Sequence, residues 1–166
     1  MKYLLLVCLS TVLGFSSFAQ SNKEDIDMVQ AMYGKAKKEI VADFIKFPDS
    51  VKSAAFWKLY DSYETERKAL GRQRLAILQK YADAYATLDG KTTDDIMLQT
   101  MGLQKSVDGL IGTYYDKVKK SVGIKQAGQF YQLESYLLSA TRVYILGNIP
   151  FIGELQKAVP PTPPAK

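Results

Sequence analysis

Most of the side chains on which catalytic and metal sites depend are missing from this chain. Its 166 residues include no histidine and a single cysteine, Cys8. Acid–base chemistry by two carboxylates is therefore the main catalytic route left, because imidazole is absent and the one thiol lies near the N-terminus. The candidate carboxylates are Asp61, Glu64, Glu66 and Glu134.

The spacing of these carboxylates is that of ordinary ion pairs on a helix surface. Asp61, Glu64 and Lys68 follow one another at intervals of three and four residues, which places them on one helix face. The sequence also lacks a glycine-rich phosphate loop, a nucleophile elbow and a cluster of metal ligands. We therefore expect a protein that is not an enzyme, with no catalytic residue, no cofactor and no metal site.

Three charged residues fall on apolar helix stripes. Arg67 and Arg74 lie one heptad apart on the stripe of a helix predicted at 51–88, and Glu134 lies on the stripe of a helix predicted at 125–146. A lone buried charge is costly, so each needs a partner. The main interpretation is a structural ion pair between Glu134 and Arg67 or Arg74. There are two alternatives: the guanidinium groups of the arginines reach solvent, or the charged residues bind a ligand.

Methionines occur as two pairs with a spacing of four residues, Met28/Met32 and Met97/Met101. Thioethers bind copper(I), so such pairs are one possible metal signal. Methionine also fills irregular gaps in hydrophobic cores. Because no histidine accompanies either pair, the core-filling interpretation is preferred.

Helical periodicity runs along nearly the whole chain. Apolar residues recur at intervals of three and four, and Pro48 is the one proline between Gln20 and Asn148. Helices are predicted at residues 24–46, 51–88, 94–122 and 125–146, with breaks near Pro48, Gly90 and Gly123. The predicted fold class is all-α, an elongated bundle of about four helices that form helical hairpins with a heptad seam.

The helix predicted at 51–88 constrains the shape of the molecule. A continuous helix of this length would extend about 57 Å at 1.5 Å per residue. A compact domain of this size has a radius of gyration of about 15 Å. Either the bundle is elongated, or the helix bends, with Gly71 as the bend point.

The N-terminal residues 1–19 have the pattern of a secretory signal peptide. Lys2 precedes an apolar run at 4–15, and Ser17 and Ala19 are the small residues that flank a cut before Gln20. The run of about 12 residues is short of the ~18 that a membrane-spanning helix needs, although a retained anchor is the alternative. We expect a periplasmic or secreted protein without a membrane span after cleavage.

The other end of the chain is rich in proline. Four prolines fall within 160–164, a composition that favours an extended and flexible segment. The predicted organisation is a signal peptide at 1–19, one helical domain at 20–153 and a disordered Pro-rich tail at 154–166. The net charge of +5 is spread along the chain without a basic run, so no nucleic-acid partner is expected.

Residues 56–70 and 126–134 resemble the helical core of small envelope proteins of the Spy/CpxP-like (LTxxQ-type) family. The segments are Phe-Trp-Lys-Leu-Tyr-Asp-Ser-Tyr-Glu at 56–64, Glu-Arg-Lys-Ala-Leu at 66–70 and Gln-Ala-Gly-Gln-Phe-Tyr-Gln-Leu-Glu at 126–134. The similarity covers roughly residues 45–150. It implies an all-α envelope protein that binds unfolded clients or responds to stress, often as a cradle-shaped dimer.

The expected function is binding rather than catalysis. We expect the chain to act as a chaperone or an envelope-stress accessory whose partners are unfolded or envelope proteins, and the resemblance implies a homodimer as one form. The alternative is a structural protein with one dedicated partner and no chaperone activity. The helix at 51–88 carries more aromatic residues than one seam needs, and the client-binding candidates are Trp57, Tyr60, Tyr63, Arg67 and Arg74.

Overall fold

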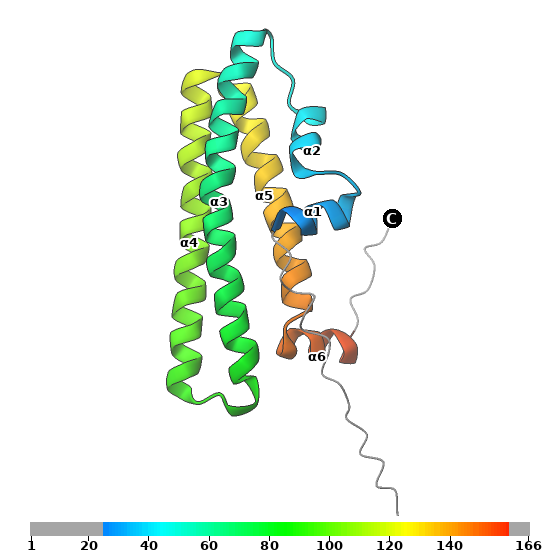
Figure 1. Cartoon of the computed structure of the whole chain (residues 1–166), viewed down its shortest axis with the longest axis vertical. Coiled ribbons are helices and arrows are strands. Elements are labelled where there is room, and N and C mark those ends of the chain that lie inside the picture. The colour runs from blue at the N-terminus through cyan, green and yellow to red at the C-terminus, as the bar shows by residue number, and fades with distance from the viewer. Residues whose placement is uncertain (1–24, 160–166) are drawn as a thin grey trace, which may run out of the picture.

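The computed structural model describes residues 25–159, and nearly all of them are helical (Figure 1). The α-helices are α1 (Asp25–Tyr33), α2 (Lys37–Phe44), α3 (Ser50–Ala84), α4 (Gly90–Ser121), α5 (Ile124–Gly147) and α6 (Pro150–Ala158). A short 3₁₀ turn, η1 (Tyr85–Thr87), continues the end of α3. No strand occurs within 25–159, so the all-α prediction is confirmed.

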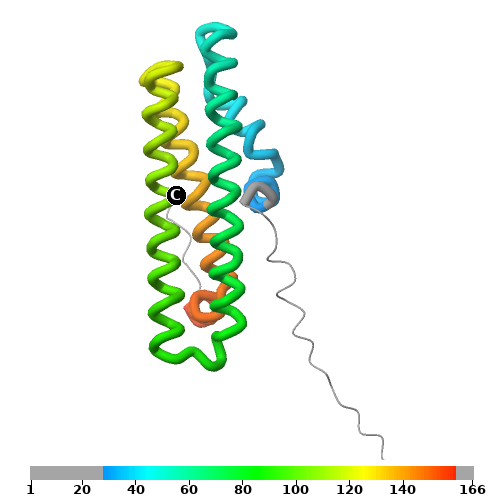
Figure 2. The backbone as a smooth tube through the Cα atoms, turned by 60° about the vertical axis from the view of Figure 1, so that its left-hand side comes forward, coloured from blue at the N-terminus to red at the C-terminus, as the bar shows by residue number. Residues whose placement is uncertain are grey.

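Three long helices, α3, α4 and α5, run side by side in alternating directions and give the molecule its elongated shape (Figures 1 and 2). α3 continues without interruption for 35 residues, and Gly71 is buried in its interior. The elongated alternative is therefore the one that the structure adopts, and α3 does not end at Gly71.

Side-chain caps fix where the long helices begin. Asp49 accepts a hydrogen bond from the backbone N–H of Lys52 at 2.7 Å, and Asp89 accepts one from that of Thr92 at 2.7 Å. Each bond satisfies an N–H that has no partner inside its helix. Because Asp89 serves as the cap, α4 begins at Gly90, four residues earlier than predicted.

The helix predicted at 24–46 is split in two, and the continuous version is wrong. Gly34 has φ +68° and ends α1, and α2 begins at Lys37. Glycine adopts this left-handed conformation at little cost. The turn allows Val29 of α1 and Ile40 of α2 to pack together against Leu137 of α5. Below, α1 and α2 (residues 25–44) are called the arm.

Close helix contact does not explain the glycines of α4. A Cβ atom added at Gly102, Gly109 or Gly112 would meet no other side chain or neighbouring helix within 4 Å. These glycines therefore leave open space beside α4.

The hydrophobic core fills one half of the bundle, which we call the closed end (residues 50–71 and 107–141). Aromatic rings dominate it: Tyr63 makes edge contacts with Phe130 at 5.1 Å and with Tyr114 at 5.4 Å between ring centroids. Phe56 stacks on Tyr60 at 5.8 Å. Val41 and Ile45 extend this core to the arm and the segment that follows it.

Packing is looser at the opposite half, which we call the hairpin end (residues 72–106 and 142–158). α3 has no buried residue after Gly71, and α4 buries only Ile96 and Leu103 before Val107. None of the residues of α6 is buried. The same three helices thus form a sealed core at one end and a partly open one at the other.

The C-terminal boundary differs from the prediction. Residues 154–158 belong to α6, with Pro150 at its first turn, rather than to a flexible tail. Glu154 accepts a hydrogen bond from the Tyr85 hydroxyl at 3.3 Å, which links α6 to the end of α3. The predicted signal peptide and residues 160–166 lie outside the described part. Between 25 and 159, no helix is both long and apolar enough to cross a membrane.

Candidate functional site

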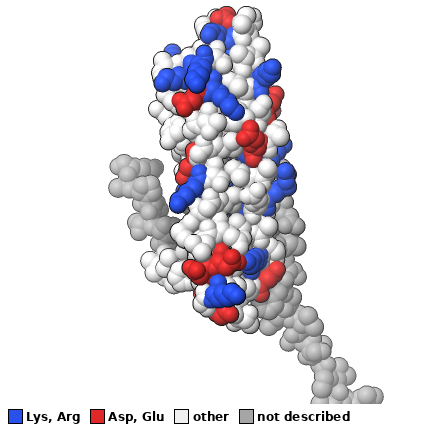
Figure 3. Space-filling model, turned by 90° about the vertical axis from the view of Figure 1, so that its left-hand side faces the viewer, with Lys and Arg blue, Asp and Glu red and all other residues white. Residues whose placement is uncertain are grey.

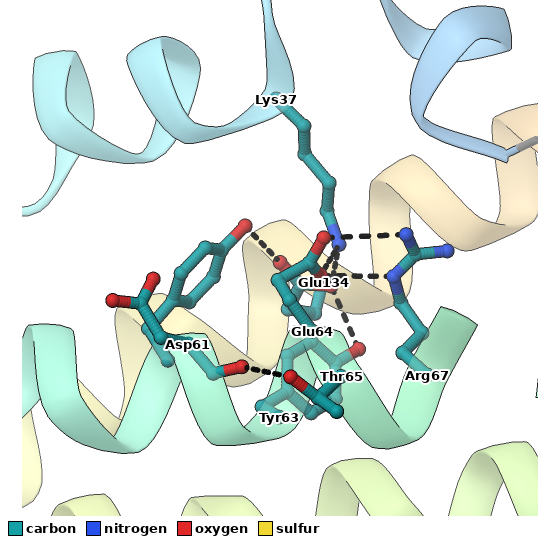
Figure 4. A network of polar contacts seen from close by, with 8 residues as sticks. Lys37, Asp61, Tyr63, Glu64, Thr65, Arg67 and Glu134 are labelled. Atoms are coloured by element: carbon teal, nitrogen blue, oxygen red, sulfur yellow. Dashed lines mark hydrogen bonds and ion pairs between the residues drawn. The ribbon is translucent and has the colours of Figure 1, made fainter. Parts of the chain in front are cut away.

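A network of charged and phenolic side chains lies between the arm, α3 and α5, inside the closed end (Figure 4). Its members are Lys37 of α2, Tyr60, Tyr63, Glu64 and Arg67 of α3, and Glu134 of α5. The heptad spacing of α3 places its four members on the face that meets α5.

Glu134 is the innermost member, with 0% of its surface exposed. Its Oε2 accepts hydrogen bonds from the Lys37 ammonium at 2.6 Å and from the Tyr63 hydroxyl at 2.7 Å. Its Oε1 accepts a longer one from the Tyr60 hydroxyl at 3.4 Å. The cost of burying this carboxylate is offset by three donors, one of which is charged.

Glu64 joins the two cations of the network. Its Oε1 accepts from Lys37 Nζ at 2.7 Å and from Arg67 Nε at 2.8 Å, and its Oε2 accepts from Arg67 Nη2 at 3.2 Å. Burial by itself would raise the pKa of the Glu64 carboxyl, but Lys37 and Arg67 outweigh that effect and hold the pKa below its ordinary value. Glu64 is therefore ionised at neutral pH.

The two tyrosines act as hydrogen-bond donors. Burial and the nearby Glu134 carboxylate raise the pKa values of both Tyr60 and Tyr63 far above the ordinary value for a phenol. Their rings also flank the Lys37 ammonium, which lies 5.8 Å from the Tyr60 centroid and 5.3 Å from the Tyr63 centroid. The arrangement is chemically suited to holding an ammonium group between two carboxylates and two phenol rings.

The sequence predicts a direct ion pair between Glu134 and Arg67 or Arg74, whereas the contacts described here connect Glu134 and Arg67 through Lys37 and Glu64. Lys37 bridges Glu134 to Glu64, and Glu64 contacts Arg67. Arg74 lies two helical turns further along α3 and is half-buried. One signal for Lys37 is present in the sequence, since Lys37 shares a helix face with Ile40 and Val41.

The other candidate carboxylates are exposed. Asp61 forms a surface ion pair with Lys38 at 2.5 Å, and Glu66 accepts a hydrogen bond from the Tyr114 hydroxyl at 2.6 Å. Glu64 and Glu134 are the two candidates that the fold brings together, through their shared Lys37. Within residues 25–159, no group of three or more His, Cys, Asp or Glu side chains is arranged to hold a metal ion.

Burial changes the interpretation of the predicted client-binding residues. Tyr60, Tyr63 and Arg67 are buried, because the arm and α5 cover the face of α3 on which they lie. They belong to the interior network and form no part of an open surface in this conformation. Trp57, which lies beneath the Lys38 ammonium at 5.3 Å, and Arg74 keep partial exposure.

Large exposed apolar side chains are spread over the arm, the closed end and the hairpin end, and we single out those of the hairpin end. They are Met97, Leu98 and Met101 of α4, Val143, Tyr144 and Leu146 of α5, and Phe151 and Leu155 of α6. Core filling therefore does not account for the Met97/Met101 pair, although Met28 is buried. We call this set the hairpin-end surface. An uncharged band separates charged clusters on the face that Figure 3 shows.

A shallow groove runs between α3 and α4 at the same end. Its α3 side is lined by Gln73, Ala76, Ile77 and Lys80, and its α4 side by Gln99, Gly102, Leu103 and Ser106. The open space at Gly102 contributes to this groove. The comparisons with protein-family models, with curated proteins and with solved structures give no match to this chain.

Proposed function

We propose that this protein is an exported, non-enzymatic binding protein that holds apolar segments of unfolded or partner proteins on its hairpin-end surface. This places it functionally with chaperones and envelope-stress accessories. The export part of the proposal rests on the signal-peptide pattern at 1–19.

The observation that supports binding is the unequal packing of the two ends. Leu75, Ile77, Leu78 and Tyr81 of α3 occupy the part of the helix that has no buried residue, and each stays half-buried. Side chains such as Leu98, which is 58% exposed, lie on the neighbouring helix. Apolar side chains left exposed on several neighbouring helices are a feature of interaction surfaces.

The composition of the surface favours adaptable contacts. Methionine is flexible and polarisable, and it is common on surfaces that bind varied sequences. Exposed basic residues, including Lys105 and Arg142, lie along the same stretch of the helices. They would increase the rate of encounter with acidic clients, and the apolar groups would slow dissociation.

The test is suppression of aggregation of several unrelated unfolded proteins by the purified chain without residues 1–19. We expect suppression by the wild type and a clear loss of it in a Leu98→Lys, Phe151→Lys variant. Ile124→Lys is the matched control, because Ile124 is similarly exposed (60%) but lies at the closed end. Equal loss in the control variant would contradict the placement of the surface.

A different outcome would favour the alternative function. If aggregation is not suppressed at any ratio of protein to client, while one native partner binds tightly, the chain is a structural protein with a dedicated partner. The same two variants then show whether that partner uses the hairpin-end surface.

A further inference from the structure

The Lys37 ammonium lies in a cage whose walls all come from other parts of the chain (Figure 4). Glu64 and Glu134 contact it at 2.7 and 2.6 Å, and the rings of Tyr60 and Tyr63 flank it. We call these four residues the ammonium cage. Two carboxylates with two aromatic rings are the groups that recognise ammonium ligands in proteins.

The cage is built by the bundle and not by the arm. Tyr60, Tyr63 and Glu64 lie on α3 and Glu134 lies on α5, so their positions are set by helices that pack through the aromatic core. When Lys37 is removed, three charged side chains of the network remain, and their charges sum to −1. They are Glu64, Glu134 and Arg67. A buried net charge requires a compensating cation.

The arm supplies that cation from one face of an amphipathic helix. Lys37 is followed at three and four residues by Ile40 and Val41, which place an apolar strip beside the lysine on one helix face. Ile40 packs with Leu137 of α5, and Val41 packs in the main core. Any amphipathic helix with a lysine in this register presents the same groups.

We propose that Tyr60, Tyr63, Glu64 and Glu134 form a binding site for the lysine of an amphipathic helix in a partner protein, which Lys37 of the arm fills in the resting chain. The arm is thus an internal occupant that a partner segment replaces. The partner segment carries a lysine followed by apolar residues at positions +3 and +4. This site lies inside the closed end and is independent of the hairpin-end surface.

The first part of the test empties the cage with Lys37→Ala and adds n-butylammonium, with n-butanol as the uncharged probe of similar shape. We expect the variant to melt at a lower temperature than the wild type. Saturating n-butylammonium should raise its melting temperature by about 3 °C, and n-butanol should not. The double variant Lys37→Ala, Glu134→Gln should not respond, because Glu64, the one carboxylate left in its cage, is already paired with Arg67. Equal effects of the two probes would overturn the proposal.

The second part measures binding of a labelled peptide with the sequence of residues 35–46 and of its Lys37→Met version. The lysine peptide should bind the Lys37→Ala chain about tenfold more tightly than the methionine peptide, as a charged hydrogen bond predicts. The preference should disappear in the double variant. If Lys37→Ala does not fold, the Lys37→Met chain is used with the same peptides. Equal affinity of the two peptides, or no binding of either, would refute the site.

Discussion

At the scale of single residues, the molecule depends on the charge balance around Glu134. A carboxylate with no exposed surface is compatible with folding only because Lys37, Tyr60 and Tyr63 donate to it. The sequence indicates that Glu134 and Arg67 are buried, since both interrupt apolar stripes. It does not indicate that Lys37 joins Glu134 to Glu64, because the contact between Lys37 and Glu134 depends on how the arm folds back across 97 residues of sequence separation.

Replacing Glu134 should therefore be costly. Glu134→Ala leaves the Lys37 ammonium next to a single carboxylate and leaves the Tyr63 hydroxyl without its acceptor, so we expect a loss of about 3 kcal/mol in the free energy of unfolding. Asp61→Ala is the control, because the Asp61–Lys38 pair is exposed and should matter little. Urea titrations of both variants give the comparison, and a mutant at Glu134 as stable as the Asp61 control would show that the network contributes no stability.

The lowered pKa of Glu64 gives the network a pH dependence. Because the folded state holds the carboxyl ionised, its contribution is fully present above the pKa of the unfolded chain, about 4.3, and is lost as the pH falls through the lower folded value. In Glu64→Gln this part of the acid destabilisation should be absent. The difference in unfolding free energy between wild type and Glu64→Gln, measured from pH 7 to pH 2.5, should be constant above about pH 5 and shrink below about pH 4. A difference in unfolding free energy that grows as the pH falls would contradict a lowered pKa of Glu64 in the folded state.

At the scale of elements, apolar periodicity and capping residues predict the three long helices within a few residues. The two errors have different physical origins. The spacing of three and four continues across Gly34, so the pattern alone shows no break there, and the turn is set by packing of α1 and α2 against α5. At the C-terminal end, Pro150 follows α5 and occupies the first turn of α6, a position that proline favours, so the helical region extends past the predicted boundary at 153.

The glycines of these elements provide a matched pair of substitutions. Gly34→Ala should destabilise the protein by about 1 kcal/mol, because φ +68° is unfavourable for alanine even though a Cβ there meets nothing within 4 Å. Gly109→Ala in α4 should stabilise it by a similar amount, since the helix interior favours alanine and the site is open. Thermal unfolding of the two variants decides the matter. Two shifts of the melting temperature in the same direction would mean that helix propensity at Gly109 and the positive φ at Gly34 do not determine how these substitutions change stability.

At the scale of the whole molecule, the two ends of the bundle differ in role. The closed end provides most of the stability, and the hairpin end carries the hairpin-end surface. The closed end holds the aromatic core and the ionic network, and the hairpin end holds half-buried apolar side chains on the same helices. Local stability follows the number of buried apolar contacts, so the two ends should open at different free energies although α3 runs through both.

Hydrogen exchange of backbone amides should show this division directly. In α3, we expect residues 56–67 to exchange at rates close to those of global unfolding, and residues 75–84 to exchange much faster through local opening. α6 should exchange fastest of the described helices, because none of its residues is buried. Phe151→Ser, at the exposed end of α6, is the control and should leave protection of the closed end unchanged. Uniform protection along α3 would mean that the hairpin end is as tightly packed as the closed end. Uneven packing would then no longer support the hairpin-end surface as a binding site.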